Sequence, residues 1–288
     1  MLRRARRAPP ARATASLTPP PLSARASPRP RRPKEANTLQ ADFYRCALPA
    51  QTRDWLAKFS LAGDGRFFVA QLHAWNASME PENVYFYGAV ASIRDAQARG
   101  VAAAGVGVEL ASAVDGGDPY APATSIHPRG KQTPGRRLAA AILARRFNVA
   151  VPFASPRYAR AAAAPPPAGA TLALAVALEG ARGAPPPLLT YVAPSPASNS
   201  SRCPTDLTIP AFMCAGFELM LDDAPFPNGT WVPAAAAIDA ARTGLVLSAA
   251  APAGARAAGS RNGWNAWPIV NFYAEDGLLP LLPWSEAV

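Results

Sequence analysis

The residue of this 288-residue chain best suited to acid–base chemistry is His127, in the stretch SIHPRGKQTPGRRLA. Imidazole changes its charge near neutral pH, so a histidine in an open loop can take up and return a proton. Arg129 and Lys131 follow it closely and could attract an acidic group, although such bases also suit a solvated helix start. The chain has one other histidine, His73, which ends a short apolar run and is expected to be structural.

The elements that would position His127 are predicted from hydrophobic periodicity. Residues 48–63 favour a helix, and residues 66–75 (RFFVAQLHAW) favour a buried strand because aromatic and branched residues are concentrated there. Residues 81–100 favour a second helix, and residues 105–110 (GVGVEL) alternate as a second strand. Strand, helix and strand at this spacing predict a parallel βαβ unit.

The loop that carries His127 follows the second of these strands. A helix is predicted after the loop, with Thr133 as its cap and Pro134 at its first position. His127 is therefore expected beyond the carboxyl end of a parallel strand, which is where open α/β sheets hold their active sites.

A change in composition divides the chain further on. Residues 151–170, which include AAAAPPPAGA, are predicted to be a linker. Short apolar runs separated by Gly, Pro and Asn clusters then predict a small antiparallel β-domain of the sandwich type over residues 171–288. The expected fold class is thus α/β over residues 41–150, followed by this β-domain.

The formal charge of +10 is concentrated in a tail. Residues 1–40 carry ten Arg and Lys and a single acid, Glu35, whereas the rest of the chain carries nineteen bases and eighteen acids. We expect this tail to be disordered because it is rich in Arg and Pro. No aromatic residues alternate with its arginines to stack on bases, so nucleic acid is not an expected partner. No apolar run reaches the length of a membrane span.

The cysteines and the tail leave the compartment open. Cys203 and Cys214 could pair, which would leave Cys46 free, and the three cysteines lack the spacing of a metal site. No metal or cofactor is expected. A tail with many arginines and few acids is typical of an organelle transit peptide. Glycosylation sequons would instead matter in a secreted protein. They begin at Asn76, Asn199 and Asn228.

The stretch SIHPRGKQTPGRRLA, residues 125–139, resembles the histidine-bearing signature of sialate O-acetylesterases, in which Ile-His-Pro leads into a basic helix. Further stretches are similar to this family in colinear order from residue 42 to residue 288. These are YRCALPAQTRDWLAKFS, VDGGDPYAPATSIHP, CAGFELML and RNGWNAWPIVNFYAEDGLLPLLPW. The resemblance implies a partial flavodoxin-like (SGNH-hydrolase) parallel sheet over residues 41–150.

The resemblance also implies a reaction, the removal of O-acetyl groups from sugars, typically sialic acid. A serine attacks the acetyl carbonyl, and a histidine, matched here by His127, takes the serine's proton and returns it to the leaving alcohol. Relatives often place the orienting Asp just upstream of the histidine, where this chain has Thr124 and Ser125. The nearest acids are Asp115 and Asp118, and either could orient His127.

The same resemblance assigns a substrate, an O-acetylated sugar. Arg129 and Lys131 would then meet the carboxylate of an acidic sugar such as sialic acid. Three tryptophans of the C-terminal region, Trp264, Trp267 and Trp284, could stack on a sugar face, but we expect them to pack in the core.

Two segments of the family are missing from this sequence. They are the Gly-Gln-Ser-Asn stretch that bears the nucleophile and the Gln-Gly-Glu stretch that helps to form the oxyanion hole. The chain is therefore expected to correspond to the C-terminal part of such an esterase, with an incomplete α/β sheet and no turnover on its own. The alternative is a non-catalytic carbohydrate-binding or vestigial module. The oligomeric state stays open.

Overall fold

The structure is a computed structural model that describes residues 40–59, 66–75, 87–105, 107–122, 125–180, 186–193, 203, 214–276 and 279–288. Residues Ala36–Val288 form one compact unit. Apart from Gln40, the basic tail lies outside the described residues, as do the sequons at Asn76 and Asn199. In the described part of the chain, no helix is long and apolar enough to cross a membrane.

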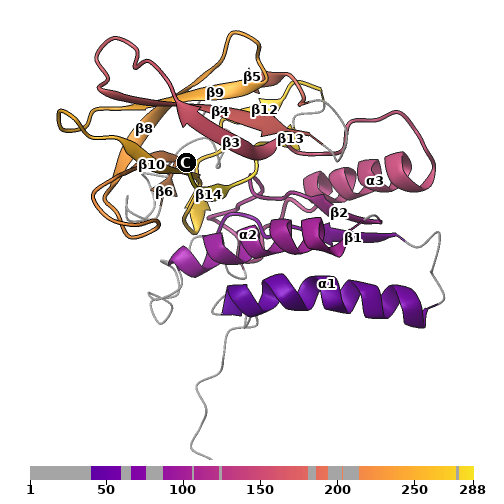
Figure 1. The fold of residues 1–288 in the computed structure, drawn as a ribbon. Coiled ribbons are helices and arrows are strands. Elements are labelled where there is room, and N and C mark those ends of the chain that lie inside the picture. The colour runs from indigo at the N-terminus through magenta and orange to yellow at the C-terminus, as the bar shows by residue number, and fades with distance from the viewer. Residues whose placement is uncertain are drawn as a thin grey trace, which may run out of the picture. The chain divides into compact units, whose positions relative to one another are not determined.

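The first half of the unit is a small α/β layer. Its elements are α1 (Ala41–Lys58), β1 (Phe67–Ala70), α2 (Tyr87–Ala104), β2 (Val108–Ala111) and α3 (Gln132–Arg146). The two strands pair in parallel, from Phe67 opposite Val108 to Ala70 opposite Ala111. Figure 1 shows the strands between α2 and α3, with α1 alongside α2. The predicted βαβ unit is present and consists of β1, α2 and β2.

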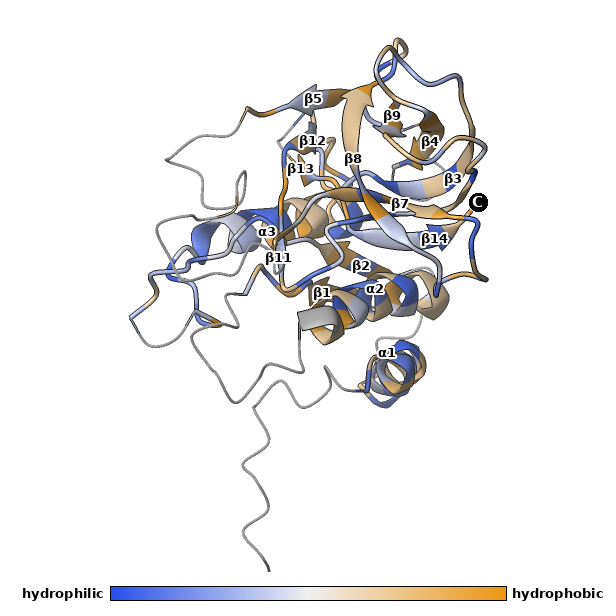
Figure 2. Cartoon of the chain, turned by 90° about the vertical axis from the view of Figure 1, so that its left-hand side faces the viewer, coloured by the Kyte–Doolittle hydropathy of each residue, from blue (hydrophilic) through white to orange (hydrophobic). Residues whose placement is uncertain are grey.

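An apolar cluster holds this layer together. Leu48 of α1 and Val101 of α2 pack with Val69 and Val108 of the two strands. Gly100 makes room for the close approach of the helices, because a Cβ atom at this position would lie 3.1 Å from the Leu48 Cδ2 atom and would force a small shift of that side chain. Figure 2 shows β1 and β2 in hydrophobic colours, as expected for parallel strands covered on both faces.

The second half of the unit is dominated by a seven-stranded antiparallel sheet, in the order β14-β10-β7-β8-β9-β4-β3. Its strands are β3 (Arg157–Ala163), β4 (Leu172–Glu179), β7 (Phe217–Leu221), β8 (Trp231–Ile238), β9 (Gly244–Ala249), β10 (Ala257–Asn262) and β14 (Trp284–Ala287). The two edge strands approach each other, since the rings of Tyr158 on β3 and Trp284 on β14 are 5.6 Å apart. The sheet therefore curls around its apolar face, which gathers the buried leucines of β4, β7 and β9 into one core.

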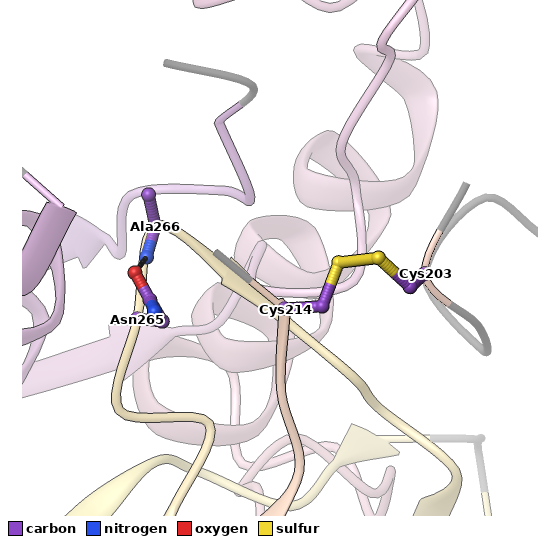
Figure 3. Close-up of a disulfide and its surroundings, with 4 residues drawn as sticks. All are labelled: Cys203, Cys214, Asn265 and Ala266. Atoms are coloured by element: carbon purple, nitrogen blue, oxygen red, sulfur yellow. Dashed lines mark hydrogen bonds between the residues drawn. A yellow bond between two sulfur atoms is a disulfide. The ribbon is translucent and has the colours of Figure 1, made fainter. Parts of the chain in front are cut away.

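Two small sheets complete the described structure. One pairs β5 (Leu189–Tyr191), β12 (Phe272–Ala274) and β13 (Leu279–Pro280), and the other pairs β6 (Cys214–Ala215) with β11 (Trp267–Pro268). The predicted pairing of Cys203 with Cys214 is confirmed, and Cys46 is free and exposed. Figure 3 shows this disulfide near the turn that carries Asn265 and Ala266.

The expected fold class is wrong. A flavodoxin-like core needs a wide parallel sheet, whereas the parallel sheet of the described residues has two strands and the main sheet is antiparallel, with seven. Periodicity identified the local βαβ pair, but it carries no information on how many strands join the sheet. The expected small sandwich is one curled sheet, and residues 151–170, expected as a linker, contain β3.

Two details of the helices also differ from expectation. Helix α1 begins at Ala41, ahead of the predicted residue 48. Helix α3 begins at Gln132 with Lys131 as its N-cap residue and no side-chain cap, so Thr133 lies inside the helix. Thr133 followed by Pro134 has the composition of an N-cap residue and a first helical residue. The sequence pattern therefore placed the start of this helix two residues too late.

One buried cation joins the α/β layer to the antiparallel region. Arg94 of α2 is fully buried, and its guanidinium donates to the carbonyl oxygens of Leu72 at 3.0 Å and of His73 at 2.6 Å. It also donates to the carbonyls of Asn265 at 2.8 Å and of Ala266 at 2.9 Å. We call this arrangement the Arg94 junction. Burial lowers the pKa of Arg94 to about 9, so the group stays charged at neutral pH.

Substitutions at Arg94 should show the strength of the junction. Arg94→Met should lower the free energy of unfolding by about 3–5 kcal/mol, because four carbonyl oxygens lose a hydrogen bond from the buried guanidinium. Arg94→Lys keeps the charge without the planar fork and should recover only part of this loss. Urea unfolding measures both variants. The control is Arg136→Met, since Arg136 is exposed and donates to the Gln132 side chain on the surface of the same helix. Similar stability of all three variants would contradict the junction.

The disulfide gives a second prediction. Reducing Cys203–Cys214 should lower the free energy of unfolding by about 2–3 kcal/mol, because the bond closes a short loop of the unfolded chain. Thermal unfolding with and without reductant measures the effect. Cys46→Ser should leave both values unchanged, since that thiol is free. Peptide mapping that finds free thiols at both Cys203 and Cys214 would contradict the pairing.

Candidate active site

His127 lies in the loop from β2 to α3, after the carboxyl end of a parallel strand. Its side chain is exposed, whereas Ser125 and Pro128 on either side of it are buried. Burial of these neighbours anchors the loop and leaves the imidazole facing solvent, where a substrate could reach it.

The first anchor of the loop is an ion pair between Asp118 and Arg129. The Nε and Nη2 atoms of Arg129 donate to the two carboxylate oxygens of Asp118 at 2.6 and 3.0 Å. The backbone N–H of Arg129 adds a bond of 3.2 Å to the same carboxylate. Hydrogen bonding from Arg129 lowers the pKa of Asp118 below its ordinary value. An ionised Asp118 therefore fixes the backbone two residues after His127.

The second anchor is an ion pair between Asp115 and Arg137 of α3. The Nη1 and Nη2 atoms of Arg137 donate to the carboxylate oxygens of Asp115 at 2.6 and 2.8 Å. Nη1 also donates to the Ser112 carbonyl at 2.9 Å. Both side chains are about nine-tenths buried. This pair holds the start of the loop against the helix that ends it.

The predicted site residues all lie in this loop, but they differ in exposure and in their partners. His127, Arg129 and Lys131 are exposed, while Asp115 and Asp118 are turned to arginine partners. Which acid orients His127 stays a prediction. Among the described residues, no group of three His, Cys, Asp or Glu side chains could hold a metal ion.

His73 lies beneath this loop. Its Nδ1 atom is 2.7 Å from the Ala74 carbonyl oxygen, and the backbone of Ile126 also bonds the ring. Burial is the main cause that lowers the pKa of His73 from 6.5 to about 4, with the charges of Arg94 and Lys131 acting in the same direction. A neutral, partly buried ring that supports the residue before His127 is consistent with the structural role expected of it.

Sequence reasoning missed a network of buried amides behind the site. The Ser112 hydroxyl donates to the Gln71 amide oxygen at 2.7 Å, and the Gln71 amide nitrogen donates to the Arg94 carbonyl at 3.3 Å. The Gln97 amide oxygen accepts the Leu72 backbone N–H at 3.0 Å. The sequence did carry a signal for this network, namely polar residues inside otherwise apolar strands and helices. Because Ser112 is buried, it serves this network and is not presented to substrate.

The fold is similar to that of a carbohydrate acetylesterase from Xanthomonas citri, with a TM-score of 0.62 and 21% sequence identity. The similarity covers 88% of this chain and 48% of that protein, so the chain spans about half the length of the solved structure. At this identity the likeness is one of fold. No family model matches the sequence, and no curated protein matches it.

The lowered pKa of His73 predicts a loss of stability in mild acid. Between pH 6.5 and about 4 the unfolded chain binds a proton at His73 and the folded chain does not, so stability falls as the pH falls. The loss should reach about 3 kcal/mol across this range. His73→Gln should flatten this slope of unfolding free energy against pH. An imidazole NMR signal of His73 that titrates near 6.5 would contradict the prediction.

Proposed function

We propose that this chain is the histidine-bearing part of a carbohydrate O-acetylesterase, with a sialate-type substrate. One observation carries the proposal. An exposed His127, anchored at the carboxyl end of β2, lies in a chain whose fold resembles a carbohydrate acetylesterase over 88% of its length. The resemblance of the Ile-His-Pro stretch to the sialate O-acetylesterase signature adds to it.

In this proposal His127 moves protons. It takes the proton of a serine hydroxyl as the serine oxygen attacks the acetyl carbon, and it returns this proton to the sugar oxygen that leaves. Water then attacks the acetyl-serine ester while His127 takes a proton from that water. His127 gives this proton to the leaving serine oxygen, so acetate is released and the serine hydroxyl is restored. The serine would come from a segment of the Gly-Gln-Ser-Asn kind, which this 288-residue sequence does not contain.

The residues around His127 would position its imidazole and attract the substrate. Asp118 is favoured over Asp115 as the acid that positions His127, because it already binds the backbone of Arg129, two residues away. Lys131 is exposed and would attract the carboxylate of an acidic sugar, beside the exposed part of Arg129. The role of Arg129 toward substrate is secondary, since its guanidinium already holds Asp118.

A non-catalytic carbohydrate-binding module is the second candidate. The absence of a Gly-Gln-Ser-Asn stretch from the sequence favours it, because a general base with no activated nucleophile loses most of its rate advantage. Both candidates bind a sugar, and release of acetate separates them.

Acetate release from O-acetylated sialic acid tests the proposed reaction. The product of the complete transcript should release acetate, and His127→Ala should lower kcat roughly 1,000-fold or more, because the serine loses its base. The 288-residue chain alone should release acetate at the uncatalysed rate.

Two comparisons sharpen this test. Arg136→Ala is the matched control, because Arg136 is exposed on the first turn of α3 and should change kcat little. Asp118→Asn should lower kcat more than Asp115→Asn, relative to the amount of folded protein. Full activity of His127→Ala would overturn the proposal, and a complete product that binds sugar without releasing acetate would favour the binding module.

A further inference from the structure

Only one of the three tryptophans considered for sugar stacking is accessible. Trp267 and Trp284 are buried, Trp267 against Ala74 and the disulfide and Trp284 in the core of the large sheet, as expected for packing residues. Trp264 is partly exposed and lines a pocket of about 320 Å³. This volume is within the range of small-molecule sites, about 300–1,000 Å³.

The remaining walls of the pocket come from the start of α1 and the first half of α2. Gln40, Asp42 and Arg45 are the N-cap residue and first turns of α1, and Ser92 and Asp95 belong to α2. The pocket therefore joins an indole face to several hydrogen-bonding side chains. An aromatic surface for the C–H groups of a pyranose ring and polar groups for its hydroxyls are what recognition of a sugar requires.

The polar wall is held in place by ion pairs. An oxygen of the Asp95 carboxylate lies 3.3 Å from the Arg45 guanidinium, and both oxygens accept the Nε–H of Arg99 at 2.8 and 2.9 Å. Arg45 also lies 3.6 Å from the Asp42 carboxylate, which is almost fully exposed. These contacts preorganise donors and acceptors on one side of the pocket, so little side-chain entropy would be lost on binding.

The charge of the pocket favours one class of sugar. Two carboxylates, Asp42 and Asp95, and one guanidinium, Arg45, line the pocket, and Arg99 binds the same Asp95 carboxylate, so these charges balance. These groups therefore offer no excess of positive charge to a sugar that carries a carboxylate, whereas neutral hydroxyls can both donate to the carboxylates and accept from the guanidinium. A neutral pyranose fits this arrangement better than sialic acid does.

The pocket and the His127 loop share a support. The Ala266 carbonyl, two residues after Trp264, accepts from the Trp75 backbone N–H at 3.0 Å and from Arg94 in the Arg94 junction. Ile126, which precedes His127, packs against the cluster formed by Trp75, Val90 and Ala266. The Trp264 wall and the His127 loop are thus fixed to the same few buried residues.

We propose that the Trp264 pocket binds a neutral pyranose, as the sugar unit next to the acetylated sugar of the substrate. This inference rests on the proposed function for the identity of the substrate as a glycan. Trp264 supplies the stacking face, and Asp95 and Arg45 bind the ring hydroxyls. Arg129 and Lys131 remain the groups that meet an acidic sugar at His127.

Binding of lactose to the 288-residue chain tests the proposal, by saturation-transfer NMR and tryptophan fluorescence. Trp264→Ala should weaken lactose binding roughly tenfold, and Trp264→Phe, which keeps an aromatic face, should retain part of it. The matched control is Trp55→Ala, because Trp55 is a partly exposed tryptophan near the other end of α1 and outside the pocket. Free N-acetylneuraminic acid should not compete for the site.

Each outcome decides one of the two proposals. Lactose binding that Trp264→Ala leaves intact, no lactose binding at all, or competition by N-acetylneuraminic acid would each overturn the pocket assignment. None of these results bears on acetate release, which is measured separately on the product of the complete transcript. Lactose binding that depends on Trp264, together with no acetate release from the product of the complete transcript, would retain the pocket and overturn the esterase.

Discussion

The burial of one guanidinium is the constraint on which the rest of the structure depends. A buried cation without solvent is costly unless hydrogen bonds replace its hydration, and Arg94 obtains four of them from backbone carbonyls. Two of these carbonyls follow β1, and the other two lie more than 170 residues further along the chain than Arg94. The α/β layer and the antiparallel region must therefore meet at the carboxyl end of β1. The neutral ring of His73 packs at the same place and contacts the loop above it.

The candidate site is built on this meeting point. Two bidentate ion pairs, Asp118 with Arg129 and Asp115 with Arg137, fix the loop on either side of the exposed His127. Ile126 connects the loop to the apolar cluster around Ala266, and the Trp264 pocket begins two residues before that alanine. The His127 loop and the Trp264 pocket thus depend on the same buried residues, and a change in the Arg94 junction would disturb both.

Sequence patterns predicted the elements whose residues differ clearly from their surroundings. The strand around Val69, the helix before Gly100 and the leucine-rich β4 and β9 were found because their apolar residues are concentrated or alternate. Strands β3, β8 and β10 were not predicted, because runs of alanine and an internal Pro233 have little strand preference. These strands form through pairing with their neighbours in the sheet. The flavodoxin-like fold class was wrong because it came from the resemblance, and a βαβ pattern identifies one pair of strands without showing which sheet the rest of the chain forms.

The sequence by itself determined that His127 stands in a loop before a basic helix, that Cys203 and Cys214 can pair, and that the positive charge lies in the N-terminal tail. Only the tertiary structure decided which partners the charged residues take. Asp115 and Asp118 are equivalent candidates in the sequence, yet each faces a different arginine. Arg94 is indistinguishable in the sequence from a surface arginine, and Trp264 from its buried neighbour Trp267. Burial and pairing depend on contacts between residues far apart in the chain, and local composition and periodicity carry no record of them.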